Sequence, residues 1–326
     1  MQIQRLTYIM ITALLLVTCT DDKRQETGHQ ATLHVTTSMA RVTRTAKYSG
    51  LQENALSTDV HAAFYVYREG TAAITSGYGY ENLTYDYNTT QTARTHKTVF
   101  FPEDWSDVDV FVYAPRVESP EAATIIPITV QEDQSTQAAY IASDFVFGSA
   151  NVDYAYPVAN IDVTLYHALS KLILNFQDVN GAISTLGTLQ KVELGTETYP
   201  IRLNAYVNIT TPVSSAADVA ANNAVTTLAT YGIITMLDVS KEQTATPWSV
   251  ACILPPQTLP NEGVNLTLTF STGNTYTGIL EATLTAGCTH TYTITVDQEE
   301  LTFSGVTVQP WGSGWGNDDA PSEIIY

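Results

Sequence analysis

The sequence is poor in cysteine and in basic residues, and each shortage excludes a class of protein. Three cysteines in 326 residues are too few for a disulfide scaffold, and their separation does not match the spacing of zinc ligands. Lys and Arg together number 14 against 33 Asp and Glu, which gives a net charge of −19. Such a charge disfavours contact with nucleic acid, so we expect no nucleic-acid partner.

Motifs for catalysis and for metal binding are also missing from the sequence. The six histidines are scattered, and no HExxH, GxSxG, P-loop, GxGxxG or CxxC motif occurs. Acidic groups around Asp104 and Asp318 lack the closing glutamate of an EF-hand, so solvated acidic turns explain them better than calcium sites. We therefore expect no enzymatic activity, no cofactor and no metal site.

One long apolar run lies at the start of the chain, at residues 6–17, behind the basic Arg5. It is shorter than the roughly 20 residues that a membrane-spanning helix needs. The run leads directly to Cys19 and resembles a bacterial lipobox, which predicts a lipoprotein signal at 1–18 and lipidation of Cys19. A lipid on Cys19 would anchor the chain to the outer membrane. An ordinary signal peptide that carries a cysteine by chance is the alternative.

The residues after Cys19 are polar and acidic, and they resemble the export tag of surface-exposed lipoproteins. Residues 19–30 are therefore predicted to be a flexible tether on the outside of the cell. A strand-like segment follows at 31–44 and carries two arginines, Arg41 and Arg44, in a chain that has few basic residues.

Short alternating strands fill the rest of the sequence, and long helical stripes are nearly absent. This pattern predicts an all-β fold of two tandem β-sandwiches, with a boundary near residue 159 that separates an N-terminal domain, 31–158, from a C-terminal domain, 159–326. Pro127 indicates an edge strand because proline cannot donate to a central ladder. The clearest local predictions are strands at 60–70 and 108–114, a strand–bend–strand unit at 161–179, and a hairpin at 264–284 that turns at 271–274.

Four tyrosines alternate along one predicted strand pair, at Tyr78, Tyr80, Tyr85 and Tyr87. Such a row can stack on sugars, and a monomeric surface lipoprotein that binds glycans is therefore one functional hypothesis. Aromatic pairing within a sheet explains the same pattern more simply.

Several strings occur in an order that resembles the fimbrillin family, the subunits of type V pili in anaerobic gut and oral bacteria. The strings are LHVTTSMARVTRT, VHAAFYVY, FFPEDWSDVDVFVYAPRV, VTLYHALSKLILNF, CILPPQTL, GCTHTYTITVD and the closing VQPW. The resemblance covers most of the chain after the signal. It implies two transthyretin-like β-sandwich domains and a structural role in a cell-surface pilus that supports adhesion.

The resemblance also implies assembly by donor-strand exchange. An arginine-specific surface protease would remove the first strand, cutting after Arg44 or, as the second choice, after Arg41. The emptied groove would accept a strand from the C-terminus of another fimbrillin subunit. The candidate donor residues lie between 301 and the end of the chain: Leu301, Phe303, Val306, Val308, Trp311, Ile324, Ile325 and Tyr326.

Two alternatives stay open within this interpretation. Residues 301–309 can instead be a permanent last strand of the second domain, which leaves only the tail as a donor. Cys252 and Cys288 fall inside the resembling strings, and a disulfide between them is left open because the sequence does not show whether their strands are neighbours. Host or bacterial surface receptors are expected as further partners, and the sequence does not separate a stalk subunit from a tip or an anchor.

Overall fold

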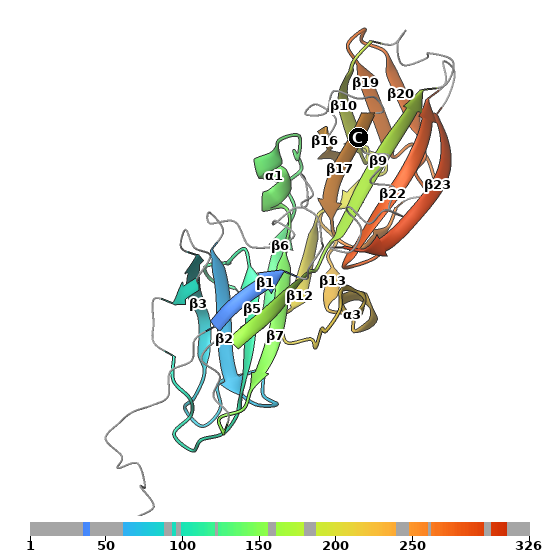
Figure 1. The fold of residues 1–326 in the computed structure, drawn as a ribbon. Helices are drawn as coiled ribbons and strands as arrows, with labels where there is room; N and C mark the ends of the chain where they lie inside the picture. Colours follow the sequence, from blue (N-terminus) through green and yellow to red (C-terminus); the bar gives the residue numbers. More distant parts are fainter. Residues whose placement is uncertain are drawn as a thin grey trace, which may run out of the picture.

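The structure is a computed structural model that describes residues 35–39, 61–87, 93–95, 99–120, 123–155, 161–178, 187–238, 248–259, 262–296 and 301–311. Strands are the dominant regular structure of the described residues, and the helices among them are the short α1 (Gln137–Ala142) and α3 (Ala216–Ala221). Figure 1 shows an elongated molecule in which two β-rich lobes follow one another. The predicted all-β fold with two sandwich domains is confirmed.

The N-terminal lobe is built on a seven-stranded sheet with the order β1-β8-β7-β5-β2-β3-β4. Its central strands are buried on both faces, because Phe64 and Val66 of β2 enter one apolar cluster and Tyr65 and Tyr67 enter another. In sheet order the strands are β1 (Val35–Met39), β8 (Ile161–His167), β7 (Val146–Val152), β5 (Val108–Ala114), β2 (Ala62–Arg68), β3 (Tyr80–Tyr87) and β4 (Ala93–Thr95).

The C-terminal lobe packs a five-stranded sheet, β16-β17-β9-β22-β23, over a four-stranded sheet, β15-β10-β19-β20. The predicted hairpin is confirmed, since β19 and β20 pair antiparallel on either side of residues 271–274. The strands of this lobe are β16 (Leu237–Asp238), β17 (Trp248–Leu254), β9 (Ser170–Asp178), β22 (Cys288–Val296), β23 (Leu301–Pro310), β15 (Ile234–Thr235), β10 (Leu189–Leu194), β19 (Leu266–Phe270) and β20 (Thr275–Gly278).

Three small sheets complete the described fold. They are β13 (Val225–Thr227), β12 (Asn204–Asn208) and β6 (Ile125–Thr129) in one sheet, β11 (Ile201–Arg202) with β14 (Tyr231–Gly232), and β18 (Gln257–Thr258) with β21 (Thr283–Leu284). Pro127 lies on β6, at the edge of its sheet and opposite Tyr206, as its missing N–H predicts.

The chain passes between the two main sheets at Ala168 and Leu169, where a buried bend separates β8 from β9. The predicted strand–bend–strand unit is therefore present. Its first strand, β8, however, pairs with β1 and β7 of the N-terminal sheet. Strand β8 therefore belongs to the N-terminal lobe, although it follows the boundary that we expected near residue 159. The physical reason is that sheet membership depends on distant partners, whereas the composition change near 159 is local.

A second connection between the lobes is made by Gln134, whose side chain is fully buried. Its Nε2 donates to the backbone oxygen of Ile253 (2.7 Å), and the N–H of Ile253 donates to its Oε1 (2.9 Å). The amide thereby pairs with β17 as the backbone of a neighbouring strand would. This contact fixes the loop before α1 against the C-terminal sheet.

Candidate functional site

The most exchangeable element of the N-terminal sheet is its first strand, β1. It lies at the edge of the sheet, and β8, with which it pairs in parallel, is its one neighbour among the described strands. Five positions are in register, from Val35 opposite Ile161 to Met39 opposite Leu165. An edge strand with a single neighbour can be replaced without breaking any other ladder of the sheet.

Strand β8 depends on β1 for most of its pairing. Its register with β7 covers only two positions, Val146 opposite His167 and Phe147 opposite Tyr166. Beyond them comes Gly148, where an added Cβ would lie 2.0 Å from the backbone oxygen of Thr164, so only glycine fits this close approach. Loss of β1 would therefore leave residues 161–165 without a strand register on either side, and an incoming strand would restore it.

The same part of β8 contributes to the core of the N-terminal lobe. Ile161, Val163 and Leu165 are at most 3% exposed and belong to one apolar cluster with Phe64 and Val112. A strand that replaces β1 must therefore complete both a backbone ladder and the border of a hydrophobic core. Sequence reasoning missed these acceptor residues, although the alternation of apolar side chains in 161–165 was visible.

The predicted donor residues lie near the C-terminal end of the chain, in one group at 301–311 and another at 324–326. Leu301, Phe303, Val306 and Val308 lie on β23, which pairs antiparallel with β22 from Leu301 to Pro310. Val306 and Val308 are about half exposed, at 56% and 52%. Trp311 follows the strand and is buried at 1% exposure. The structure therefore has 301–311 as part of the C-terminal lobe, in line with the alternative of a permanent last strand.

Trp311 is held at the junction between the lobes by three contacts. Its ring stacks on His167 at the end of β8, its backbone N–H donates to the backbone oxygen of Gly287 (2.6 Å), and the Nζ of Lys171 lies 5.7 Å from its ring centroid. His167 in turn places Nδ1 2.9 Å from Oδ2 of the buried Asp144. Nothing in the sequence pointed to Asp144 as the partner of His167.

The remaining predicted sites lie outside the described residues. They are the lipidation site Cys19, the cleavage sites Arg41 and Arg44, and the terminal Ile324, Ile325 and Tyr326.

The two described cysteines are both free thiols. Cys252 lies on β17 and Cys288 on β22, and β9 is hydrogen-bonded between these strands. Strands on either side of a third are about 9.5 Å apart, whereas a disulfide needs Cα atoms within roughly 7 Å. The disulfide left open by the sequence is therefore not formed in this structure. Burial raises the pKa of both thiols, which favours the neutral, unreactive form.

The tyrosine row shows internal packing where the structure describes it. Tyr78 and Tyr80 meet edge to face with centroids 5.6 Å apart, and the Tyr78 hydroxyl donates to the backbone oxygen of Phe100 (2.7 Å). Both rings are partly buried. This geometry is that of an aromatic pair within a sheet rather than an exposed stacking platform.

The acidic residues around Asp104 take part in loop structure. Arg68 reaches Asp104 (2.5 Å) and holds the pKa of that carboxyl down at about 2, and Asp107 accepts the N–H of Tyr154 (2.8 Å). Among the described residues, no three His, Cys, Asp or Glu side chains are arranged to hold a metal ion. None of the described helices is long and apolar enough to cross a membrane.

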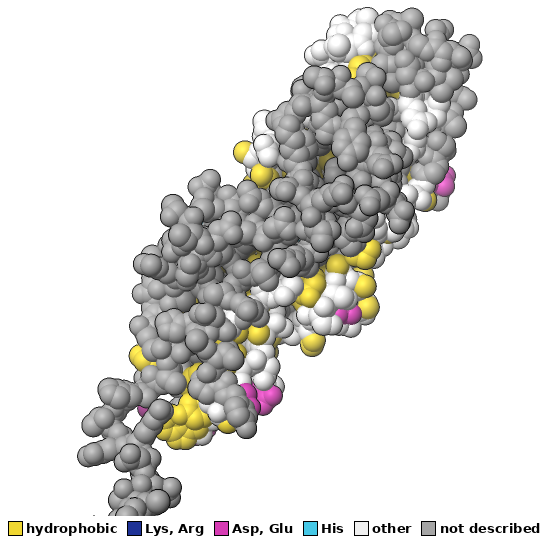
Figure 2. Space-filling model, viewed as in Figure 1, with side chains coloured by type: hydrophobic (Ala, Val, Ile, Leu, Met, Phe, Trp, Pro, Cys, Tyr) yellow, Lys and Arg dark blue, Asp and Glu magenta, His cyan; other side chains and the backbone are white. Residues whose placement is uncertain are grey.

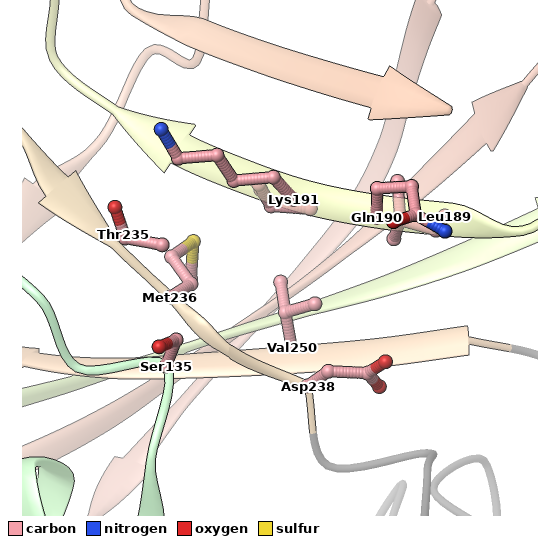
Figure 3. A pocket seen from close by; sticks show the side chains of 9 residues that line it. Ser135, Leu189, Gln190, Lys191, Thr235, Met236, Asp238 and Val250 are labelled. Carbon is pink, nitrogen blue, oxygen red and sulfur yellow. The ribbon is translucent and has the colours of Figure 1, made fainter. Parts of the chain in front are cut away.

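A small pocket lies between β10 and β17, where the chain crosses from β15 to β16. Figure 3 shows Val250 of β17 pointing towards β10, with Met236 of the crossing chain beside it. The pocket has a volume of about 30 Å³, room for little more than a water molecule. It is too small for a ligand-binding function.

These observations define a class of protein: a two-lobed β-sandwich protein whose first described strand is paired at one edge of its sheet. The chain belongs to the fimbrillin-like family, whose sequence model matches residues 43–311. Family membership supports a fimbrial subunit. No curated protein matches the chain.

Solved structures show the same fold at low sequence identity. A candidate cell adhesion protein from Bacteroides ovatus is 18% identical, with a TM-score of 0.64 over 86% of this chain and 98% of its own. Another from Bacteroides uniformis is also 18% identical, with a TM-score of 0.59 over 88% and 100%. The C-terminally truncated tip fimbrial protein of Porphyromonas gingivalis is more distant, at 11% identity and a TM-score of 0.43 over 86% and 100%.

Proposed function

We propose that this protein is a structural subunit of a cell-surface fimbrium that assembles by exchange of β1 for a strand of another subunit. The observation that supports the proposal most directly is the pairing of β1, which has β8 as its one strand neighbour among the described residues. Removal of β1 breaks a single five-residue ladder and exposes the apolar border formed by Ile161, Val163 and Leu165. An incoming strand satisfies both by β-augmentation.

The positions of the predicted processing sites fit this exchange. β1 lies after the lipidation site Cys19 and before Arg41 and Arg44. A single cut after Arg44 therefore separates the subunit from its lipid anchor and from β1 together. In this scheme the protein reaches the outer membrane as a surface lipoprotein, and an arginine-specific protease at the surface converts it into an acceptor.

The donor segment is residues 312–326. Nine positions of β22 pair with β23, and Trp311 is buried at the junction, so using 301–311 as a donor would open the C-terminal sheet. The last fifteen residues follow Trp311 and end in Ile324, Ile325 and Tyr326. They supply a glycine-containing leader, which carries Trp315 and the acidic Asp318, Asp319 and Glu323, and apolar side chains at the tip.

The test is to follow processing and polymerisation in cells that produce the chain together with an arginine-specific surface protease. Wild type should lose its first 44 residues, as shown by N-terminal sequencing, and should form heat-resistant ladders on gels. The double variant Arg41→Ala/Arg44→Ala should keep its N-terminus and stay monomeric. Arg24→Ala is the matched control, because this arginine precedes β1 and its loss should leave processing and polymers intact. Normal ladders from the double variant would overturn the proposal.

A further inference from the structure

A groove lies beside α3, close to the junction between the lobes, and the proposed function leaves it unused. It has a volume of about 330 Å³. Strand β13 forms one wall and strands β18 and β21 form the other. Buried Val219, Leu284 and Ala286 provide an apolar floor. Figure 1 shows α3 and β13 side by side near the junction.

The wall formed by β13 presents unpaired backbone groups. β13 ends its sheet, with β12 as its one neighbour among the described strands. The N–H of Asn208 donates to the oxygen of Ala224, and the N–H of Leu228 donates to the oxygen of Asn204. Hydrogen-bonded positions alternate in an antiparallel ladder, so the backbone groups of Val225 and Thr227 point away from β12. Both residues line the groove, which therefore offers a strand edge.

The lining of the groove suits the apolar part of an extended peptide. None of its lining residues is acidic or basic, although the chain carries a net charge of −19. The charged side chains coloured in Figure 2 are acidic, which is the sign of the net charge of the chain. The groove itself offers threonine hydroxyls at the rim, such as those of Thr258 and Thr283, and an apolar floor, which suit apolar side chains.

The groove begins where the proposed acceptor strand ends. The hydroxyl of Tyr166, on β8, donates to the oxygen of Ser214 just before α3 (2.7 Å). A Cβ on Gly287 would lie 2.5 Å from the oxygen of Ala216 and 3.4 Å from that of His167, so α3 and the end of β8 meet at this glycine. Val219 of α3 and Ala286 line the groove. Only α3 and Gly287 therefore separate the edge of β8 from the groove.

We infer that the groove receives Ile324, Ile325 and Tyr326 of a second copy of this chain, as a second docking point for its donor tail. The inference rests on the proposed function. The tail of fifteen residues spans about 50 Å when extended, whereas the five positions that β1 occupies on β8 use roughly 17 Å. The surplus is enough to pass α3, and the tail ends in the apolar side chains that the floor requires. Its backbone pairs with Val225 and Thr227, and its side chains cover Leu284 and Ala286.

The experiment places a photo-crosslinking amino acid, p-benzoylphenylalanine, at position 326 of the full chain. Unlabelled subunits that carry it are polymerised with ¹⁵N-labelled subunits, and the crosslinked peptides are identified by mass spectrometry. The expected products join position 326 of one copy to groove residues of another, mainly around Ala220 and Leu284. Crosslinks confined to β8, or to the groove of the same copy, would overturn the inference.

A pair of variants on one helix tests the groove directly. Ala220→Trp fills the groove, since Ala220 lines it, whereas Ala217→Trp adds the same side chain on the exposed face of α3. We expect Ala220→Trp to reduce the intermolecular groove crosslinks at least tenfold and Ala217→Trp to leave them unchanged. Equal yields from the two variants would overturn the inference. Circular dichroism of both variants checks that α3 and the sheets are kept.

The outcomes separate this inference from the proposed function. If subunits polymerise through β8 and position 326 crosslinks elsewhere, the groove site is wrong and strand exchange stands. If groove crosslinks form between copies of the uncleavable Arg41→Ala/Arg44→Ala chain, the groove site stands and the requirement for β1 removal fails.

Discussion

The indole of Trp311 lies flat on the imidazole of His167, with ring centroids 4.0 Å apart and planes 2° apart. Trp311 is the last described residue of the chain, and His167 is the last residue of β8. The residue that follows β23 is therefore in contact with the end of the strand that pairs with β1.

Trp311→Ala should strongly destabilise the protein. The side chain is 1% exposed, and removal of a buried tryptophan costs about 3–5 kcal/mol through lost contacts and the cavity that remains. Urea denaturation followed by circular dichroism measures the change. Trp105→Ala is the matched control, because that ring is 54% exposed and its main described aromatic contact is with Tyr154, worth roughly 0.5–1.5 kcal/mol. Equal losses of unfolding free energy in the two variants would contradict a larger contribution from the buried Trp311.

The contributions of the buried pair Asp144 and His167 to stability should be coupled. Asp144 is 1% exposed and His167 is 3% exposed, and removal of one partner from a buried pair costs about 3–5 kcal/mol because the other group stays buried without it. Asp144→Ala, His167→Ala and the double variant form a mutant cycle read by the free energy of unfolding. We expect the double variant to lose less than the sum of the single ones by about 0.5–3 kcal/mol. Strict additivity would contradict this coupling, and exposed Asp153→Ala serves as the neutral control.

Local chemistry made much of the strand pattern predictable. Pro127 marked an edge strand because its missing N–H is a property of the residue itself, and the apolar alternation around 161–179 predicted two strands with a bend. The same alternation could not assign the first of these strands to a sheet. Its main partner, β1, lies more than a hundred residues earlier in the chain.

The candidate site was predictable only in part for the same reason. Arg41, Arg44 and the tail can be recognised in the sequence. The acceptor edge can be recognised only in the structure, where β1 and β8 lie side by side. Asp144 is one of 33 acidic residues in the sequence, and its pairing with His167 is seen only in the structure. The sequence left 301–309 open between a donor and a permanent strand, because the exposed apolar alternation of Val306 and Val308 is the same in both.

The two described cysteines should be poorly reactive in the folded protein. Cys252 is fully buried and Cys288 is partly buried, and burial raises the pKa of each thiol, so little thiolate is present at pH 8. Mass spectrometry after brief iodoacetamide treatment should show slow labelling of Cys288 and labelling of Cys252 only in denaturant. Cys288→Ser should remove the slow native labelling and leave the denatured labelling of Cys252. A non-reduced peptide that joins the two cysteines would contradict the structure.

Stability should fall below about pH 6.5 because of His290. The ring is 1% exposed, burial lowers its pKa, and its Nε2 accepts the N–H of Thr285 (2.9 Å) and so needs the neutral form. The unfolded chain binds the proton more readily, with a histidine pKa near 6.5. The stabilising contribution of neutral His290 is therefore complete above that pH. It is lost as the pH drops through the lower pKa that the ring has in the folded protein. His290→Gln keeps an acceptor without this titration. The difference in unfolding free energy between wild type and the variant should shrink or reverse from pH 7.5 to pH 5, and a constant difference would contradict the assignment.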